Sequence, residues 1–504
     1  MFTARDSREK GILAYPLPQG DIEGDIIGNM PRFPGIHSLP ADTAPLAAAA
    51  AWPIDRPLIM LHSGSSAAQW SRYSILASPM AVYRFDGRST LTGSLPADCR
   101  RPRLRHEPMA DIDAVLAATA SGSHPPRHHG DSLPPFVGGW IGYFSYDLGR
   151  VLEPAARHDA PAPDDRCWPL IELAYCPHAL VHDNLHERWH TFGPPHSPHH
   201  CVPTHTTETD DPVVGDLHCL TTPDEYVRAV ARTIQYIAAG DIFQANLAQR
   251  FTADFRGSPR RLALSALDSS GAWYGAYLET SPGRRIISLS PELFLQVNGR
   301  AERRKVVTRP IKGTRPGSAD TRQLAESEKD AAELHMIVDL MRNDLGRVCE
   351  FGSIRVEAGR VIETHRTVHH GVGQVAGNLR EDVSFGDLLQ ATFPGGSVTG
   401  APKIRAMQII DELEPIRRGP YCGAIGYISD CGNACLSIAI RTILLTGREE
   451  AGRPDCLTGV LDYSAGCGIV ADSEPLAEYR ESIDKTAVLR QALKEQKALV
   501  APDA

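Results

Sequence analysis

The sequence predicts an α+β fold, because strand-like runs and isolated amphipathic helices follow one another without a regular strand–helix–strand alternation. Residues 222–240 carry apolar side chains at helical spacing. Residues 286–295 are apolar with a break at Pro291, which is typical of two short strands. Further helices are expected from about Ser327 and from about Glu474. The elements therefore alternate irregularly, as in mixed folds with antiparallel sheets.

Composition is that of an ordinary globular protein: 504 residues, 42% apolar and 22% charged. The net charge of −9 argues against nucleic acid as the main partner. The 11 cysteines include no Cys-x-x-Cys pair, as expected for free thiols in a reducing compartment. The first ten residues lack the apolar core of a signal peptide, and the apolar run 47–52 is too short to span a bilayer. We therefore expect a soluble cytoplasmic protein without a membrane partner.

Three regions are predicted along the chain. Residues 1–215 are rich in Pro and Gly and are expected to contain short strands. A His/Pro-rich stretch near 182–210 is interpreted as a solvated insertion, because its histidines lack the regular spacing of a metal site. Within this region, the glycines of segment 138–150 predict a strand with close backbone approach or a bulge. Residues 222–490 form the second region and 491–504 a tail.

The segment 391–413 combines a Pro-Gly-Gly turn with a following amphipathic helix. Thr399 or Gly400 is expected to cap this helix, with Ala401 and Pro402 in its first turn. The exposed N–H groups of a helix N-terminus form a natural anion site. A P-loop is excluded, since Ala401 and Pro402 stand where that motif requires Lys and Ser/Thr. A carboxylate or phosphate site and a purely structural loop both remain open.

Two carboxylate pairs lie three residues apart on predicted helices. They are Asp330 with Glu333, and Glu478 with Glu481. Residues at this spacing share one helix face. Facing pairs of this kind would suit Mg²⁺, which prefers oxygen ligands and keeps several waters. The alternative is two solvated helix faces.

Several other residues have both a chemical and a structural interpretation. Lys312 follows an apolar strand, where it could be a desolvated nucleophile or a lysine that reaches back to solvent. Arg441 could bind a carboxylate, and Lys485 could add a second charge. The loop 466–473 could present backbone N–H groups. His370 could be a general acid or base, or a packed core histidine. Together these residues predict a substrate with more than one carboxylate, one of them on Mg²⁺.

The segments 327–347, 393–403 and 466–485, in this order, resemble those of the chorismate-utilising enzymes. The resemblance is strong over about residues 222–490, and segment 138–150 also fits the members that aminate chorismate. It implies a fold of two large antiparallel β-sheets packed as a sandwich with helices outside. The active site would lie in the cleft between the sheets.

The resemblance also implies a reaction. Lys312 stands in Pro-Ile-Lys-Gly-Thr, as is typical of the branch that aminates chorismate at C4, whereas the anthranilate-forming branch typically has alanine there. Lys312 would attack C2 while the C4 hydroxyl leaves, and Glu292 matches the general acid for this departure. Ammonia would add at C4 and expel the lysine, giving 4-amino-4-deoxychorismate for 4-aminobenzoate and folate synthesis.

Further roles follow from matching positions in the family. Mg²⁺ would hold the ring carboxylate through Glu333 and Glu481, with Asp330 and Glu478 nearby, and His370 would lie near the ring. The positions that match substrate-binding residues are Thr399, Gly400, Tyr427, Arg441, Gly466, Gly468 and Lys485. The chain departs from the family pattern after His370, where Gly-Val-Gly replaces Leu-Val-Ser, and at Asp330, which is glutamate in some members.

No glutaminase signature of a nucleophilic Cys with a distant His-x-Glu is found, so the resemblance implies a separate glutaminase subunit that supplies ammonia. Two alternatives are kept: the anthranilate-forming first component of the family, and a non-catalytic chorismate- or tryptophan-binding subunit. The second would require the loss of positions such as Glu292 and Lys312, which are intact. The segment 61–63 is a candidate remnant of the tryptophan pocket that some members carry.

Overall fold

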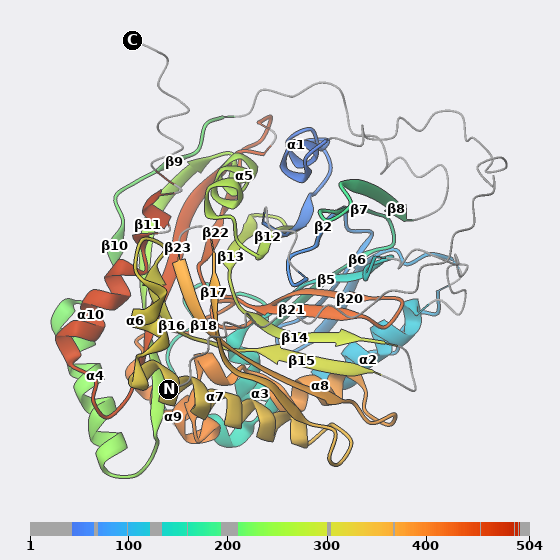
Figure 1. The fold of residues 1–504 in the computed structure, drawn as a ribbon. Helices are drawn as coiled ribbons and strands as arrows, with labels where there is room; N and C mark the ends of the chain where they lie inside the picture. The colour runs from blue at the N-terminus through green and yellow to red at the C-terminus, as the bar shows by residue number, and fades with distance from the viewer. Residues whose placement is uncertain are drawn as a thin grey trace, which may run out of the picture. The chain divides into compact units, whose positions relative to one another are not determined.

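The strands form two antiparallel sheets, and each sheet takes strands from both ends of the chain (Figure 1). The computed structural model describes residues 43–64, 69–97, 99–120, 134–158, 160–192, 210–299, 304–365, 368–453, 455–487, 489–491 and 493. These residues belong to one compact unit, His37–Ala504. The predicted regions 1–215 and 222–490 are therefore interleaved, because each contributes strands to both sheets.

Among the described residues, sheet A has 12 strands and sheet B has 11. In spatial order, sheet A contains β10 (His218–Cys219), β11 (Gln244–Gly257), β23 (Leu457–Ile469), β22 (Thr442–Glu449), β13 (Arg284–Ser290), β12 (Tyr274–Ser281), β1 (Ile59–His62), β2 (Tyr73–Ala77), β7 (Ala179–Asp183) and β8 (Arg188–Phe192), with β9 (Val213–Val214) and β19 (Gly400–Ala401) paired to β11. Sheet B contains β16 (Ile311–Pro316), β18 (Val368–Asn378), β15 (Lys305–Arg309), β14 (Leu293–Asn298), β21 (Ala434–Ile438), β20 (Ala424–Ser429), β5 (Gly139–Phe144), β6 (Ile171–Cys176), β3 (Ala81–Phe85) and β4 (Ser89–Gly93), with β17 (Arg355–Thr364) paired to β18.

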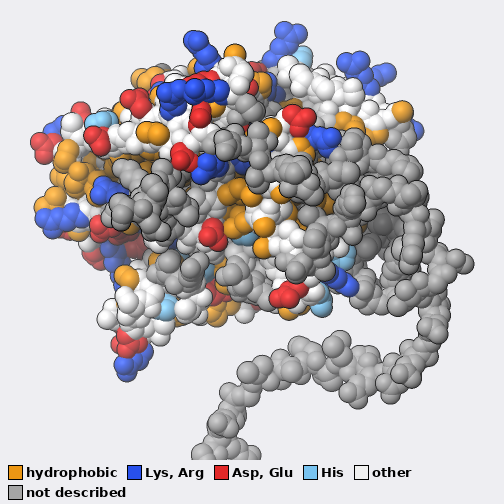
Figure 2. Space-filling model, turned by 90° about the horizontal axis from the view of Figure 1, so that it is seen from above, with side chains coloured by type: hydrophobic (Ala, Val, Ile, Leu, Met, Phe, Trp, Pro, Cys, Tyr) orange, Lys and Arg blue, Asp and Glu red, His pale blue; other side chains and the backbone are white. Residues whose placement is uncertain are grey.

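Helices cover the outer faces of the two sheets (Figure 1). They are α1 (Pro45–Ala50), α2 (Pro108–Thr119), α3 (Gly149–Leu152), α4 (Pro223–Ala238), α5 (Pro259–Ser270), α6 (Thr321–Ala325), α7 (Glu328–Gly346), α8 (Phe385–Thr392), α9 (Lys403–Leu413) and α10 (Pro475–Asp484). Among the described residues, no helix combines the length and apolarity needed to cross a membrane. On the face in Figure 2, acidic and basic side chains are interspersed.

The alternation of side chains along the strands divides the apolar residues between two layers. Ile59 of sheet A and Ile141 of sheet B belong to the core between the sheets. Met60, the next residue of β1, packs instead in the core beneath α5, and Trp140 of β5 packs in the core beneath α7. This period-2 pattern is what a sandwich with covered outer faces requires. The predicted α+β sandwich with helices outside is confirmed.

Two of the crossings between the sheets concern the site: a first crossing, between β13 and β14, and a second, between β21 and β22. The first crossing contains Pro291 and Glu292, at the break that the sequence predicts. The second crossing contains Arg441, whose backbone is left-handed with a φ of 52°. The apolar run 436–442 is therefore divided between two strands in different sheets. Both crossings bring a charged residue to the junction of the sheets.

The expected helices near residues 222–240, Ser327 and Glu474 are α4, α7 and α10. Thr222 and Glu225 form a reciprocal cap at the start of α4. Ser327 accepts a hydrogen bond from the Asp330 N–H at the start of α7. These helices could be predicted because their caps and apolar spacing lie within the same short segment.

The expected start of the helix after the Pro-Gly-Gly turn is wrong. α9 begins at Lys403, and Pro402 precedes it. Gly400 and Ala401 instead form β19, which pairs with β11. A Cβ at Gly400 would lie 2.0 Å from the Gln244 carbonyl oxygen, so only glycine allows this approach. Pairing with a distant strand therefore takes the backbone groups that a local helix would have used.

The solvated insertion near residues 182–210 is also partly wrong. His182 belongs to β7, and residues 188–192 form β8, which pairs with β7. The His182 ring packs 4.9 Å from the Trp189 ring. The buried strand β7 and its partner β8 show no alternation of buried and exposed residues that could have marked them as strands. Residues 193–209 lie outside the described residues.

The glycine-spaced strand predicted in segment 138–150 is β5. A Cβ at Gly142 would lie 2.0 Å from the carbonyl oxygen of Glu172 on β6. We predict that Gly142→Ala lowers the free energy of unfolding by about 1–3 kcal/mol, because backbone must move to admit the methyl group. Thermal unfolding checks this. Gly346→Ala is the control, since a Cβ at Gly346 would lie 3.7 Å from its nearest neighbour, a side-chain atom of Ile354. Equal thermal unfolding midpoints for the two variants would refute the close-approach argument.

Candidate active site

Lys312 lies on β16 at the junction of the two sheets and faces Gly468 of β23. A Cβ at Gly468 would lie 2.8 Å from Lys312 Nζ, so the lysine reaches across space that a larger residue would fill. The charge of Lys312 acts on three carboxylates, those of Glu292, Glu333 and Glu481. The structure thus brings the predicted nucleophile, the predicted acid and two predicted metal ligands together.

Glu292 is positioned by the first crossing between the sheets. Its carbonyl accepts the Ile438 N–H at 3.0 Å, which ties the crossing to β21, and the residue is only 4% exposed. Burial raises the pKa of its carboxyl to about 7, against the opposing effects of the Ser397 hydroxyl, the Lys312 charge and the Ile311 N–H. A carboxyl with this pKa can hold and deliver a proton near neutral pH.

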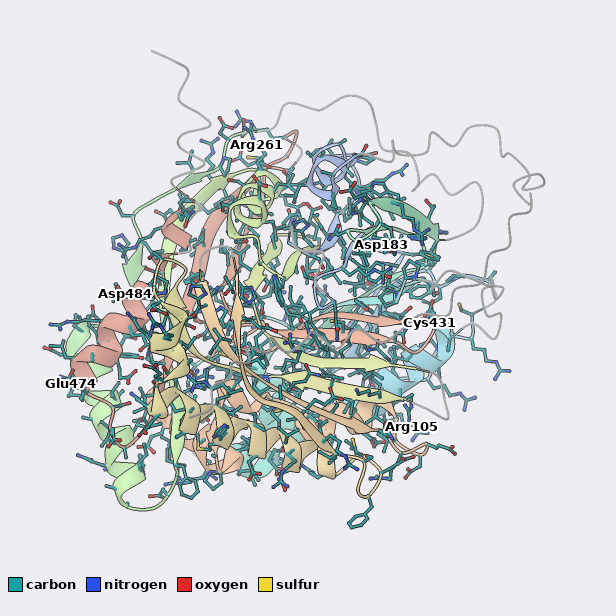
Figure 3. The ribbon with its side chains drawn as sticks, viewed as in Figure 1. Arg105, Asp183, Arg261, Cys431, Glu474 and Asp484 are labelled. Atoms are coloured by element: carbon teal, nitrogen blue, oxygen red, sulfur yellow. The ribbon has the colours of Figure 1, made fainter. Side chains whose placement is uncertain are left out.

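The acidic residues of α7 and α10 meet at one side of Lys312. Glu474 and Asp484, labelled in Figure 3, mark the ends of the α10 segment that carries Glu478 and Glu481. Burial raises the pKa of Glu333, and the negative charge of Glu478 raises it further. The alternative of a solvated helix face does not hold for Glu478, which is 6% exposed and whose carboxylate accepts the Ser473 hydroxyl at 2.7 Å. Its partner Glu481 is 58% exposed.

This arrangement fits a hard divalent cation. The carboxylates of Glu333 and Glu478 repel each other, and a cation between helices would relieve that repulsion. The fourth predicted ligand is differently engaged, because Asp330 forms an ion pair with Arg315 at 2.8 Å. Glu333, Glu478 and Glu481 are thus the residues that fit Mg²⁺ best.

Lys485 and Gly466 form part of the same corner. Lys485 Nζ donates to the Gly466 carbonyl at 2.8 Å and lies 2.9 Å from the Glu481 carboxylate. Lys485 is exposed, and its contacts with the Cys467 thiol and the Glu481 carboxylate raise its pKa. Lys485 therefore stays charged where the sequence expects a carboxylate of the substrate.

His370 and Arg441 form a second group beside the first. His370 Nδ1 is 2.9 Å from the Thr314 hydroxyl, and its Nε2 is buried without a partner among the described residues. Burial and the nearby Arg441 charge hold the His370 pKa well below its usual value. His370 is therefore neutral, and its free ring nitrogen is available to a ligand.

Thr399 and Gly400 are largely occupied by the fold. The Thr399 hydroxyl donates to the Gly395 carbonyl at 3.0 Å, and the Thr399 backbone carbonyl accepts the Asn246 N–H at 2.8 Å. Gly400 pairs with β11. These residues hold the loop against sheet A, and the anion site expected at the helix start stays a prediction.

Tyr427 lies in a different environment. It packs edge-on to Phe136, 5.4 Å between ring centroids, and lines a cavity of about 390 Å³ between the sheets. The candidate remnant of a tryptophan pocket, residues 61–63, lines the same cavity. Trp273 also lines it and packs at a tilt against His365, whose ring lies 5.1 Å from that of His370. The cavity lined by Tyr427 therefore adjoins the group that contains His370.

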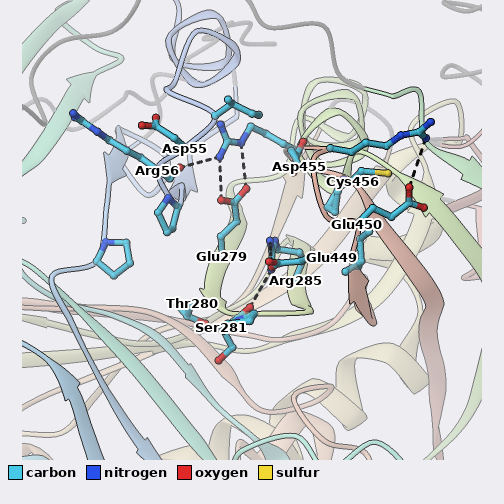
Figure 4. A pocket seen from close by; sticks show the side chains of 18 of the residues that line it. Asp55, Arg56, Glu279, Thr280, Ser281, Arg285, Glu449, Glu450, Asp455 and Cys456 are labelled. Atoms are coloured by element: carbon cyan, nitrogen blue, oxygen red, sulfur yellow. Dashed lines mark hydrogen bonds and ion pairs between the residues drawn. The ribbon is translucent and has the colours of Figure 1, made fainter.

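A larger hollow, of about 560 Å³, lies at the far turns of sheet A (Figure 4). Charged side chains that line it form ion pairs with one another: Arg260 pairs with Glu279 and Arg285 with Glu449, each at 3.0 Å. None of the predicted site residues is among its described lining residues. The predicted catalytic residues Lys312 and Glu292 lie elsewhere, at the junction of the sheets.

Gln244 is the residue that sequence reasoning missed. Its side chain is fully buried, and neither amide atom has a partner among the described residues. Its amide nitrogen, like Lys312 Nζ, would lie 2.8 Å from a Cβ at Gly468. An unpaired buried amide costs about 1–3 kcal/mol, so it is expected to serve a ligand. The only signal in the sequence is a polar residue at the start of the apolar strand β11.

Residues 63–491 match the family model described as chorismate binding enzyme. The chain therefore belongs to this family, which is the family that its three motif segments resemble.

Relatives from two branches of the family are similar to the chain. Aminodeoxychorismate synthase component 1 of Escherichia coli (strain K12) is 37% identical over 449 residues, which cover 85% of this chain and 91% of that protein. Anthranilate synthase component 1 of Aquifex aeolicus (strain VF5) is 33% identical over 470 residues, which cover 86% of this chain and 89% of that protein. Among solved structures, anthranilate synthase component I from Streptococcus pneumoniae TIGR4 superposes with a TM-score of 0.67 at 29% identity, covering 83% of this chain and 92% of that one.

The raised pKa of Glu292 gives a pH-dependent prediction. The folded-state value of about 7 lies above the ordinary 4.5, so the chain loses stability as pH rises between these values. The total decrease in the free energy of unfolding across this pH range is about 3 kcal/mol. Gln cannot ionise, so the unfolding midpoint of Glu292→Gln should rise relative to wild type between pH 4.5 and 7 and then level off.

Thermal unfolding of both chains across this pH range measures the difference. Glu381→Gln, an exposed substitution that leaves Glu292 in place, is the control. A difference between wild type and Glu292→Gln that does not change with pH would show that Glu292 has no raised pKa.

Proposed function

We propose that this chain is a transferase that aminates chorismate at C4, giving 4-amino-4-deoxychorismate for 4-aminobenzoate and folate synthesis. The observation that supports this most is Lys312, placed among carboxylates and beside the buried acid Glu292. The overall similarity to relatives does not choose between the two branches, since both are represented at comparable identity. The lysine in Pro-Ile-Lys-Gly-Thr favours the C4 branch.

Lys312 acts as the nucleophile. After its ammonium group has lost a proton to solvent, the amine adds to C2 of the ring, the two ring double bonds shift, and the C4–oxygen bond breaks. Glu292 gives its proton to the departing oxygen, which leaves as water. Ammonia then adds at C4, the double bonds shift back, and the C2–nitrogen bond to Lys312 breaks. Two substitutions with a covalent intermediate replace one difficult displacement.

The surrounding residues bind and orient the ring. The neutral His370 offers its unpaired Nε2 to a polar group of the substrate. Arg441, from the second crossing, and Lys485 supply positive charge for carboxylates. Gly468 leaves room for the ring beside the lysine, and the amide of Gln244 hydrogen-bonds either the substrate or the incoming ammonia.

Glu333 and Glu481 would hold Mg²⁺, with Glu478 beside them and Asp330 nearby, and the bound ion would neutralise the ring carboxylate of chorismate. The ammonia is proposed to come from a separate glutaminase subunit. The component 1 designation of relatives supports a second component.

Product analysis tests the proposal. The chain is incubated with chorismate, Mg²⁺ and ammonium, and the mixture is then treated with aminodeoxychorismate lyase. We expect 4-aminobenzoate, and we expect Lys312→Ala to abolish or divert its formation. Lys305→Ala is the control, because Lys305 lies on β15, which β18 separates from β16, and pairs with Glu357 at the surface. Anthranilate as the main product of wild type would assign the chain to the other branch.

Removal of a proposed metal ligand should raise the Mg²⁺ requirement. For Glu333→Gln, we expect the Mg²⁺ concentration at half-maximal rate to increase by about tenfold or more, since loss of even an outer-shell partner costs about 10- to 100-fold. Glu328→Gln, on the exposed face of α7, should leave it unchanged. Equal Mg²⁺ dependence in both variants would remove Glu333 from the metal site.

A further inference from the structure

Cys467 of β23 lies between the two glycines of the active-site strand and points to the helix side of sheet A. It is 1% exposed and packs in the core formed with α4 and α9. Its Sγ and carboxylate oxygens of Glu478 and Glu481 all lie within 4.8 Å of one another. The thiol is therefore adjacent to two carboxylates of the proposed Mg²⁺ site.

This mixed ligand set differs chemically from an all-oxygen site. Mg²⁺ has little affinity for sulfur, whereas Zn²⁺ and Co²⁺ accept Cys sulfur and carboxylate oxygen in tetrahedral sites. Ligand atoms in such sites lie about 3–4 Å apart. Glu481 can close the remaining gap once its ion pair with Lys485 is released, because its side chain is 58% exposed.

Two further contacts favour a cation here. Lys485 Nζ already lies 2.9 Å from the Glu481 carboxylate and 3.6 Å from Cys467 Sγ, so the corner accommodates positive charge. The Ser473 hydroxyl holds one oxygen of Glu478, and such outer-shell bonds orient metal ligands. The exposed Glu481 gives an entry path from solvent.

We propose that Cys467, Glu478 and Glu481 form a binding site for soft divalent cations such as Zn²⁺, which overlaps the Mg²⁺ site. The metal–sulfur bond forms as the thiol proton passes to solvent, and Lys485 is displaced from Glu481. Binding of Zn²⁺ would compete with Mg²⁺ for the shared carboxylates. Only this competition rests on the proposed function; the binding itself does not.

Cobalt tests the site directly, because a cobalt–thiolate bond gives a near-ultraviolet charge-transfer band. Purified full-length chain, reduced and metal-free, is titrated with Co²⁺. We expect the band in wild type and in Cys167→Ala, a control that removes an exposed cysteine, and not in Cys467→Ala. Cys467→Ser, which also cannot give the band, replaces Cys467→Ala if that variant does not fold.

A chelator competition with Zn²⁺ adds a second readout. Cys467→Ala should weaken Zn²⁺ binding roughly 10- to 100-fold, and millimolar Mg²⁺ should diminish the cobalt band of wild type. A band that persists in Cys467→Ala, or no band in wild type, overturns the site; a band insensitive to Mg²⁺ overturns the overlap. Failure of the proposed amination would leave the cobalt band intact, so the two proposals fail separately.

Discussion

The position of one lysine among carboxylates is the constraint on which the rest of the site depends. Lys312 is partly buried, and its charge acts on acids from three different elements. Glu292 comes from the crossing between the sheets, Glu333 from α7 and Glu481 from α10. The two-sheet architecture, with helices outside, brings these elements to one junction. The repulsion between the acids is in turn what makes a divalent cation suitable there.

Close approach of backbones is the second requirement. Gly468 leaves space for the Lys312 side chain, and Gly400 lets the loop before α9 pair with β11. A Cβ at Gly371, opposite Lys312 on β18, would lie 2.6 Å from the Lys312 carbonyl oxygen. This glycine stands where the family pattern has a leucine, so β16 and β18 approach one another in a way that a larger residue at position 371 would prevent.

Local patterns predicted much of this structure, and distant pairing accounts for what they missed. The caps of α4 and α7 lie within short segments of the sequence, and so does the i,i+3 spacing of Glu478 and Glu481. The two helices and the carboxylate pair could therefore be predicted. The start of α9 could not, because β11 lies far away in the sequence. Nor could the orphan amide of Gln244 or the environment of Tyr427, since each depends on which strands become neighbours. The roles carried over from the family stay predictions.

The most direct test of the account is a search for the covalent intermediate. The chain is mixed with chorismate and Mg²⁺ without ammonia, quenched in acid and examined by intact-mass and peptide mass spectrometry. The account predicts an added mass equal to chorismate less one water, located on Lys312. Turnover to 4-amino-4-deoxychorismate by Lys312→Ala at the wild-type rate, or an adduct on another residue, would contradict it.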